Sequence, residues 1–161
     1  MKPGDHPEFF RLPAPPGRSR ESTIVLDATG RFFHDGAIVA HRGLHRAFAA
    51  WVRRHPEDGR YILSNDYDWC YLTVEATPLF VEGLRPPAAE GEVVLRLFDG
   101  REEPLDPITL SVDGEGHLRC VVRRDMPARF QRTAQLAMAP LLDETGTAIL
   151  LGGRRYPLGD T

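Results

Sequence analysis

The sequence predicts an α+β protein built from two similar strand–helix–strand halves, the product of an internal duplication. Three observations predict it: short β-like runs that end at Asp-Gly or Gly-Gly turns, two segments with apolar residues at helical spacing, and turn residues of the first half that recur in the second. We expect an extended N-terminal arm at 1–21, a first half at 22–83, a linker at 84–91 and a second half at 92–161.

The N-terminal arm is rich in proline, glycine and arginine, which predicts that it lacks regular structure. Its apolar residues, Phe9, Phe10 and Leu12, are the candidates to anchor it on the body. In the first half, strands are expected at 22–26, 31–34, 37–39, 60–63 and 69–75. Asp35-Gly36 predicts a two-residue hairpin turn. The helix expected at 42–54 has one apolar stripe, formed by Leu44, Phe48, Trp51 and Val52.

The second half follows a similar plan. Strands are expected at 92–98, 108–112 and 117–122, and a closing hairpin at 147–151 and 154–157. Pro127 suits the first turn of a helix and predicts that a helix opens there. The apolar stripe of that helix is Phe130, Ala134, Ala137, Met138 and Leu141.

The duplication is predicted by recurring residues. Asp27, Gly30 and Phe32 recur 86 positions later as Asp113, Gly116 and Leu118. The same offset relates the helical residues Leu44, Phe48 and Val52 to Phe130, Ala134 and Met138. After the helix, an offset of 87 relates Gly59, Ile62 and Leu63 to Gly146, Ile149 and Leu150.

Charge and cysteine content narrow the classes of function. A net charge of −3 over 161 residues argues against a long nucleic-acid footprint, although a small anion needs only a local basic patch. Cys70 and Cys120 lie among apolar residues and outside any CxxC pair, so we expect two reduced, packed thiols. The N-terminus has no apolar signal core and no run is long enough to span a membrane, so we expect a cytoplasmic protein without a membrane partner.

Several stretches resemble the bacterial "domain of unknown function 1285" proteins. In the first half these are residues 27–36, 60–63, 74–75 and 78–80, and in the second half 122–125, 128–130 and 156–159. The resemblance covers residues 22 to 159. It implies a duplicated α+β core, a second half like a pleckstrin-homology fold and a ligand site between the halves, and it implies no established activity. After Leu63 the chain departs from the family pattern, because a polar stretch at 64–69 replaces a less polar one.

Catalytic and metal motifs are weak. His34, Asp35, His41 and His45 form the one metal-like cluster, but Gly43 places His41 at or before the helix start, which spoils the i, i+4 spacing. Asp66 and Asp68 do not begin a calcium loop. No GxSxG motif or phosphate loop is present. We therefore expect no cofactor and no metal, and a non-catalytic protein is the favoured hypothesis.

Four arginines flank the predicted start of the second helix: Arg123, Arg124, Arg129 and Arg132. Arg129 and Arg132 would share a helix face, beside exposed backbone N–H groups that suit a phosphate or carboxylate. The alternative is a solvated basic face that acidic residues neutralise.

Aromatic residues offer a second surface. Side chains in a strand alternate, so in 69–75 Trp69 and Tyr71 lie on one side and Cys70, Leu72 and Val74 on the other. We expect the second set, whose side chains are smaller, to face the core. Trp69 and Tyr71 would then stack on a ligand or pack against the protein itself.

The leading hypothesis is a non-catalytic binding or regulatory module. It would hold a small anionic ligand, for which a nucleotide-like molecule is one candidate, near the interface of the halves. Arg129 and Arg132 would hold the anion, Arg123 would assist, and Trp69 or Tyr71 would supply an apolar wall. The alternatives are a protein-interaction module and an enzyme using the His34–His45 region.

Overall fold

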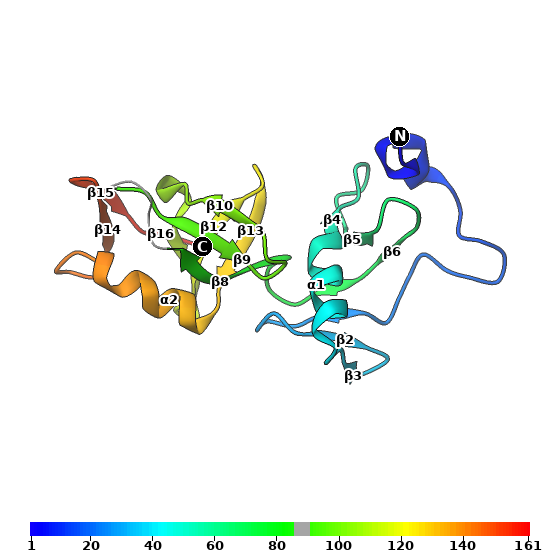
Figure 1. The fold of residues 1–161 in the computed structure, drawn as a ribbon, viewed down its shortest axis with the longest axis horizontal. Helices are drawn as coiled ribbons and strands as arrows, with labels where there is room; N and C mark the ends of the chain where they lie inside the picture. The colour runs from blue at the N-terminus through cyan, green and yellow to red at the C-terminus, as the bar shows by residue number, and fades with distance from the viewer. Residues whose placement is uncertain (86–90) are drawn as a thin grey trace. The chain divides into compact units, whose positions relative to one another are not determined.

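The contacts of the chain divide it into two units, Met1–Pro78 and Leu79–Thr161. The computed structural model describes residues 1–85 and 91–161. Within these ranges, short β-strands predominate and two α-helices accompany them, so the expected α+β class is confirmed (Figure 1). None of the helices in the described ranges has the length and apolar character that crossing a bilayer requires.

The first unit contains one α-helix, seven short strands and two 3-10 helices. In chain order these are η1 (Pro3–Asp5), η2 (Pro7–Arg11), β1 (Val25–Leu26), β2 (Phe32–His34), β3 (Ala37–Ile38), α1 (Arg42–Trp51), β4 (Val52–Arg54), β5 (Tyr61–Ser64), β6 (Trp69–Tyr71) and β7 (Thr73–Val74).

The strands of this unit form two small sheets, ordered β3-β2-β1-β7 and β4-β5-β6. The Asp35-Gly36 turn joins β2 to β3 as the sequence predicts, with both residues at positive φ. β7 pairs in parallel with β1 and so ties the chain that leaves the second sheet back to the first. Leu26 and Phe32, opposite each other in β1 and β2, are fully buried.

Helix α1 begins where the sequence predicts and ends earlier. At its start, the side chain of His41 accepts a hydrogen bond from the N–H of Leu44, 3.1 Å away, and so caps the helix. The helix was expected to reach Arg54, but it ends at Trp51 because Val52–Arg54 pairs with β5 as strand β4. Val52 is buried from this strand rather than from the helical stripe.

The N-terminal arm is more ordered than its composition predicts. Residues 3–11 form η1 and η2, and Phe9 and Phe10 are buried, as expected of anchoring residues, whereas Leu12 is exposed. The proline-rich stretch that follows leads back to β1.

The second unit holds the remaining elements. They are β8 (Leu79–Arg85), β9 (Val94–Leu97), β10 (Glu102–Pro104), η3 (Pro107–Thr109), β11 (Ser111–Val112), β12 (Leu118–Val122), β13 (Met126–Phe130), α2 (Arg132–Met138), η4 (Ala139–Leu141), β14 (Ala148–Leu151), β15 (Arg154–Pro157) and β16 (Gly159–Asp160).

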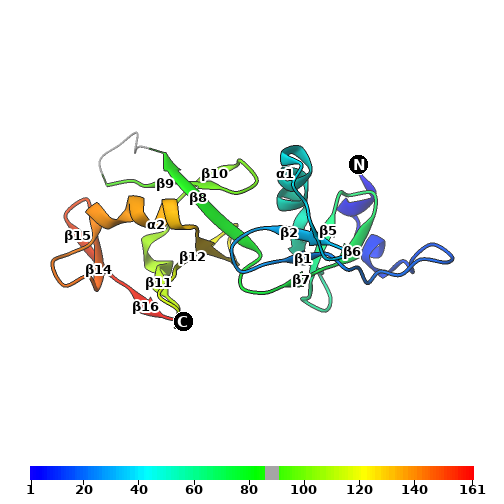
Figure 2. The ribbon, with the colours of Figure 1, turned by 90° about the horizontal axis from the view of Figure 1, so that it is seen from below.

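A seven-stranded sheet, ordered β10-β9-β8-β13-β12-β11-β16, forms the body of this unit. Helix α2 packs against β8 and β13 and covers one face of the sheet (Figure 2). The expected closing hairpin is present as β14 and β15.

Pro127 does not open a helix, and that prediction is wrong. It lies in β13, opposite Val121 of β12, and α2 begins only at Arg132. The alternation of buried Met126, Ala128 and Phe130 has the period of a strand, and it outweighs the preference of proline for a first helical turn.

The boundary between the units also differs from the expected one. It falls after Pro78, because residues 79–85 form β8 and pair with β9 and β13 of the second unit. Residues 84 and 85 of the expected linker therefore belong to a strand. Residues 86–90 of that linker lie outside the described residues.

Candidate functional site

The arginines that the sequence singled out are held mainly by acids of their own unit. Arg129 lies in β13, and its side chain is only 5% exposed. Its Nη2 atom lies 2.8 Å from Oδ2 of Asp113, and Arg119 reaches the same oxygen from β12 with Nε at 3.0 Å. Two guanidinium groups thus share one buried carboxylate.

Asp113 is well suited to this role. Burial alone would raise its pKa, but the backbone N–H groups of His117 and Glu115 and the two guanidinium groups outweigh burial and hold the pKa well below its usual range. Asp113 is therefore charged whenever the protein is folded near neutral pH, and it neutralises the cations beside it.

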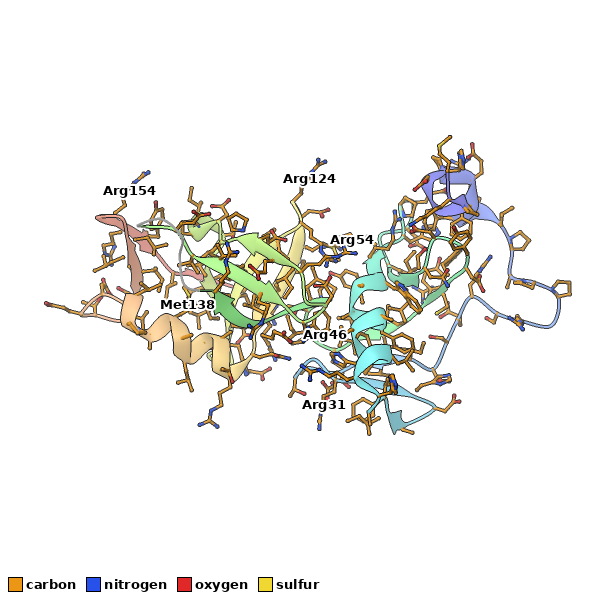
Figure 3. The ribbon with its side chains drawn as sticks, viewed as in Figure 1. Arg31, Arg46, Arg54, Arg124, Met138 and Arg154 are labelled. Atoms are coloured by element: carbon orange, nitrogen blue, oxygen red, sulfur yellow. The ribbon has the colours of Figure 1, made fainter. Side chains whose placement is uncertain are left out.

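Arg123 and Arg132 do not join Arg129. Arg123 lies in the turn between β12 and β13 at a positive φ, and its guanidinium pairs with Asp99, whose side chain is completely buried. Arg132 is the exposed first residue of α2, so it does not share a helix face with Arg129, which is in a strand. Arg124, next to Arg123, points away from the sheet (Figure 3). The cluster is thus divided among internal ion pairs and exposed positions.

The metal-like histidines also have other partners. His41 caps α1, Nε2 of His45 lies 3.0 Å from the carbonyl oxygen of Gly30, and His34 lies beside Asp35. Within residues 1–85 and 91–161, no three His, Cys, Asp or Glu side chains gather as metal ligands.

The aromatic residues of β6 are the predicted site residues that the structure does bring together with others. Trp69 and Tyr71 join His55 and Ile62 in a group that we call the aromatic pocket. The ring centroids of His55 and Trp69 are 5.0 Å apart, and His55 stacks on Tyr71 at 5.9 Å. Trp69 is buried, although alternation placed it opposite the expected core side, because the N-terminal segment covers it.

Phe9 and Phe10 fill the aromatic pocket. They are 7% and 4% exposed and form one hydrophobic cluster with Ile62 and Trp69. The ring of Phe10 lies 5.8 Å from that of His55, edge to face, and 6.1 Å from that of Trp69. Both centroid distances lie in the range of interacting aromatic pairs, and the His55 pair has the favoured edge-to-face arrangement.

The pocket also binds the main chain of this segment. Nε1–H of Trp69 donates to the carbonyl oxygen of Phe9 at 3.3 Å, and Nε2 of His55 lies 3.0 Å from that of Phe10. Nδ1 of His55 accepts from the backbone N–H of Glu57, so the proton lies on Nε2 and His55 is the donor to Phe10. Two consecutive carbonyl groups are therefore each recognised by a side chain of the pocket.

Charged side chains line the rim. The guanidinium of Arg53 lies over the ring of Phe10, 4.6 Å from its centroid, and Arg11 pairs with Glu57. At the far end of the segment, the N–H of Gly4 donates to the carbonyl oxygen of Asp66 at 2.8 Å. A Cβ atom at Gly4 would lie 2.8 Å from Cα of Asp66, so the close approach requires glycine.

Arg20 fastens the base of the arm. Its Nη1 donates to Asp68 and to the carbonyl of Trp69 at 2.7 and 2.9 Å, and its Nη2 donates to the carbonyls of Leu12 and Pro13. The guanidinium also lies 4.5 Å from the centre of the Trp69 ring. Arg20 thus holds the start and the end of the loop between residues 12 and 20 close together.

Sequence reasoning found Trp69, Tyr71 and the anchoring phenylalanines, but it missed His55, Arg53 and Glu57. The sequence predicts a helix over residues 52–54, where the structure has strand β4. The direction of the His55 side chain, which follows this strand, could therefore not be predicted. The adjacent Phe9-Phe10 in an otherwise polar arm was the one available signal of a pocket elsewhere.

Comparison with solved structures identifies the fold. A DUF1285 family protein from Silicibacter pomeroyi superposes with a TM-score of 0.68, at 14% identity, over 86% of this chain and 80% of that one. A DUF1285 family protein from Shewanella baltica gives a TM-score of 0.62, at 13% identity, over 80% of this chain and 98% of that one. The chain has the DUF1285 fold.

The resemblance seen in the sequence is therefore confirmed at the level of the fold. No protein-family model matches the chain, and no curated protein matches it. At these identities the DUF1285 fold says nothing of a ligand, so the function has to be argued from the site.

Proposed function

We propose that this chain with the DUF1285 fold is a non-catalytic protein-interaction module whose first unit binds a peptide in the aromatic pocket. The observation that carries the proposal is that Trp69 and His55 contact the rings of a diphenylalanine segment and also bind the carbonyls of its main chain. The chain's own N-terminal segment is the peptide that displays this recognition.

The contacts resemble those of a peptide complex more than those of a hydrophobic core. Side-chain donors that bind consecutive main-chain carbonyls recognise a peptide in a defined register, and pockets for its side chains add specificity. Here the close approach of Gly4 to Asp66 fixes the register of the segment. Phe9 and Phe10 occupy the two aromatic positions. Arg11 occupies a basic position, where it pairs with Glu57. The ligand class is thus a peptide with two adjacent aromatic residues followed by a basic one.

The small-anion hypothesis receives less support from the same contacts. Arg129 and Arg123 would have to leave Asp113 and Asp99 in order to bind an anion. Separating a buried ion pair leaves an uncompensated charge, which costs several kcal/mol (about 3–5). Of the three, Arg132 is the one that is exposed.

We also propose that the two units are duplicates, and strand register supports this. In the first unit, Val25 pairs with Phe33 on one side and with Thr73 on the other. In the second unit, Ser111 pairs with Arg119 and with Gly159. Each of these three residues lies 86 positions after its counterpart in the first unit. The same offset relates the pair Ile62–Tyr71 to the pair Ala148–Pro157, rather than the offset of 87 expected there. The helix caps, His41 and Gln131, are 90 apart instead of 86, because the β12–β13 hairpin is longer than β2–β3.

A pleckstrin-like second half stays a prediction.

Titration calorimetry tests the binding proposal. A chain of residues 20–161, which lacks the segment but keeps Arg20, is titrated with a synthetic peptide of residues 2–12. We expect saturable binding at one site per chain. Replacing Phe10 by Ala or Gly4 by Ala in the peptide should weaken binding at least tenfold, since each removes a contact on which docking depends.

Two matched controls accompany the titration. Glu8→Ala in the peptide changes an exposed residue between the contact positions and should leave the affinity unchanged. Trp69→Phe in the protein keeps an aromatic ring but removes the N–H donor and part of the buried indole surface, and a loss of at least about 1 kcal/mol corresponds to roughly fivefold or greater weakening of binding. Equal affinity of the Phe10→Ala peptide, or absence of binding by a truncated chain whose circular dichroism is that of the folded unit, would contradict the proposal.

A further inference from the structure

We infer that the partner of the aromatic pocket in trans is the N-terminal segment of a second copy of this chain, so that two copies exchange their arms. This inference rests on the proposed function, because it takes the same pocket as its binding site. In the exchanged form, Phe9, Phe10 and Arg11 of one copy meet His55, Trp69 and Glu57 of the other.

The identity of the partner follows from the fit of the segment. The contacts of residues 4–11 with the pocket combine a glycine-dependent close approach, two buried rings, two carbonyl groups and an ion pair. Every copy of the chain carries both this segment and this pocket. A second copy therefore offers a ligand whose complementarity needs no further adjustment.

The chain between the segment and the body can open. Residues 11–19 are exposed except for the half-buried Ala14, and a turn closed by the N–H of Arg18 and the carbonyl of Pro15 lies within them. An opened linker of about nine residues spans roughly 30 Å when extended. For the linker to extend and the segment to reach a neighbour, the Arg20 hydrogen bonds to Leu12 and Pro13 have to break and the Arg18–Pro15 turn has to open.

Concentration decides between the two forms. A short linker gives a docked segment an effective concentration of the order of millimolar, so the closed form dominates at micromolar protein. Because the closed and exchanged forms make the same contacts, exchange should appear as the protein approaches millimolar concentration. Exchange of an identical element is a common route to dimers when both forms share their contacts.

Cross-linking between singly labelled chains tests the exchange. Two chains are prepared in a Cys70→Ser background, one with Arg11→Cys and one with Glu57→Cys, so that neither can link segment to pocket within itself. The two are mixed at 1 mM (roughly the effective concentration of the arm) and treated with a short bis-maleimide. We expect a cross-linked heterodimer at least fivefold more abundant than in a mixture of the Arg11→Cys and Glu144→Cys chains, and its yield should fall when mixing is done at a hundredfold lower concentration.

A chain carrying both Arg11→Cys and Glu57→Cys shows that the reagent spans the pair, since it should cross-link internally at any concentration. Internal cross-linking without excess heterodimer would overturn the exchange, while peptide binding to the truncated chain would leave the proposed function in place. Failure of peptide binding together with failure of internal cross-linking would overturn both.

Discussion

Asp113 brings together several buried polar contacts of the second unit. Its carboxylate accepts hydrogen bonds from Arg119, Arg129 and two backbone N–H groups. Asp27 plays a similar part in the first unit, where it accepts from the N–H groups of Thr29 and Arg31 and from the Arg31 side chain. These carboxylates fix turns and strand ends, and the one in the second unit holds Arg119 and Arg129 in internal ion pairs.

Replacing Asp113 by Asn should destabilise the protein by about 3 kcal/mol, because it leaves the buried Arg129 guanidinium beside a neutral amide. Chemical denaturation monitored by circular dichroism measures the change. The matched control is Glu144→Gln, which removes a charge at an exposed position and should change stability by less than about 0.5 kcal/mol. Equal effects of the two substitutions would show that the ion pairs of Asp113 contribute nothing.

The same residue predicts a dependence on pH. The folded-state pKa of Asp113 lies below the ordinary value of 3.8, so the unfolded chain binds its proton first as the pH falls. The stabilisation by Asp113 is therefore complete above about pH 5 and is lost progressively as the pH drops below 3.8 toward the folded-state pKa. The difference in unfolding free energy between the native chain and Asp113→Asn should shrink over that range. A difference independent of pH between 6 and 2 (roughly the span of those two states) would contradict this account.

Among the elements, the N-terminal segment is joined to the rest of the first unit by a mostly exposed loop, and in the proposed function it acts as a bound peptide. Its own residues make η1 and η2, and its contacts are with β4, β5, β6 and the turns that follow β4 and β5. The loop of residues 12–19 adds little to these contacts because it is exposed. Docking should therefore survive a break in the loop.

Replacing residues 14–18 by a specific protease site and cleaving it tests this expectation. After cleavage, the fragment should co-elute with the body in gel filtration at high concentration and separate on dilution, since the link that supplied the effective concentration is gone. The same chain with Phe10→Ala should release its fragment at every concentration. Immediate release of the unaltered fragment would show that the loop, and not the pocket, holds the segment.

The elements that the sequence predicted well are those with a local signal. Asp35-Gly36 specifies its hairpin through two positive φ angles, and the β14–β15 hairpin was placed within one residue. The errors arose where tertiary pairing overrides a local preference. Pro127 favours a helix start, but β13 is fixed by its pairing with β12 and β8, and Val52 fits the α1 stripe but pairs with β5.

The candidate site was predictable in part for the same reason. Trp69 and Tyr71 stood out as aromatic residues on a strand, and Phe9 and Phe10 as apolar residues in a polar arm. Phe9 and Trp69 are 60 positions apart in the sequence, and a contact over that separation cannot be predicted from hydrophobic periodicity. The arginines that are neighbours in the sequence do not form one cluster, because Arg129 lies in a strand rather than in a helix. From that strand its guanidinium reaches Asp113 and forms an ion pair with it.

At the scale of the whole molecule, two units with matching strand registers carry different surfaces. The first unit has the aromatic pocket on β5 and β6. Under the proposed duplication, the corresponding hairpin of the second unit is β14 and β15, where Ala148, Arg155 and Pro157 stand in place of Ile62, Trp69 and Tyr71. On the proposed duplication, one copy has kept or acquired a peptide site while the other retains the scaffold.

The indole N–H signals of the tryptophans report directly on whether the N-terminal segment occupies the aromatic pocket. The chain has two tryptophans, and only Trp69 bonds to the N-terminal segment, among the contacts of the described residues. In nuclear magnetic resonance spectra, we expect deletion of residues 1–19 to shift the Trp69 indole signal and to speed its exchange with solvent, and the peptide of residues 2–12 to restore both. The signal of Trp51 is the internal reference. A Trp69 signal that the deletion leaves unchanged, or that the peptide does not restore, would contradict a peptide-binding pocket in the first unit.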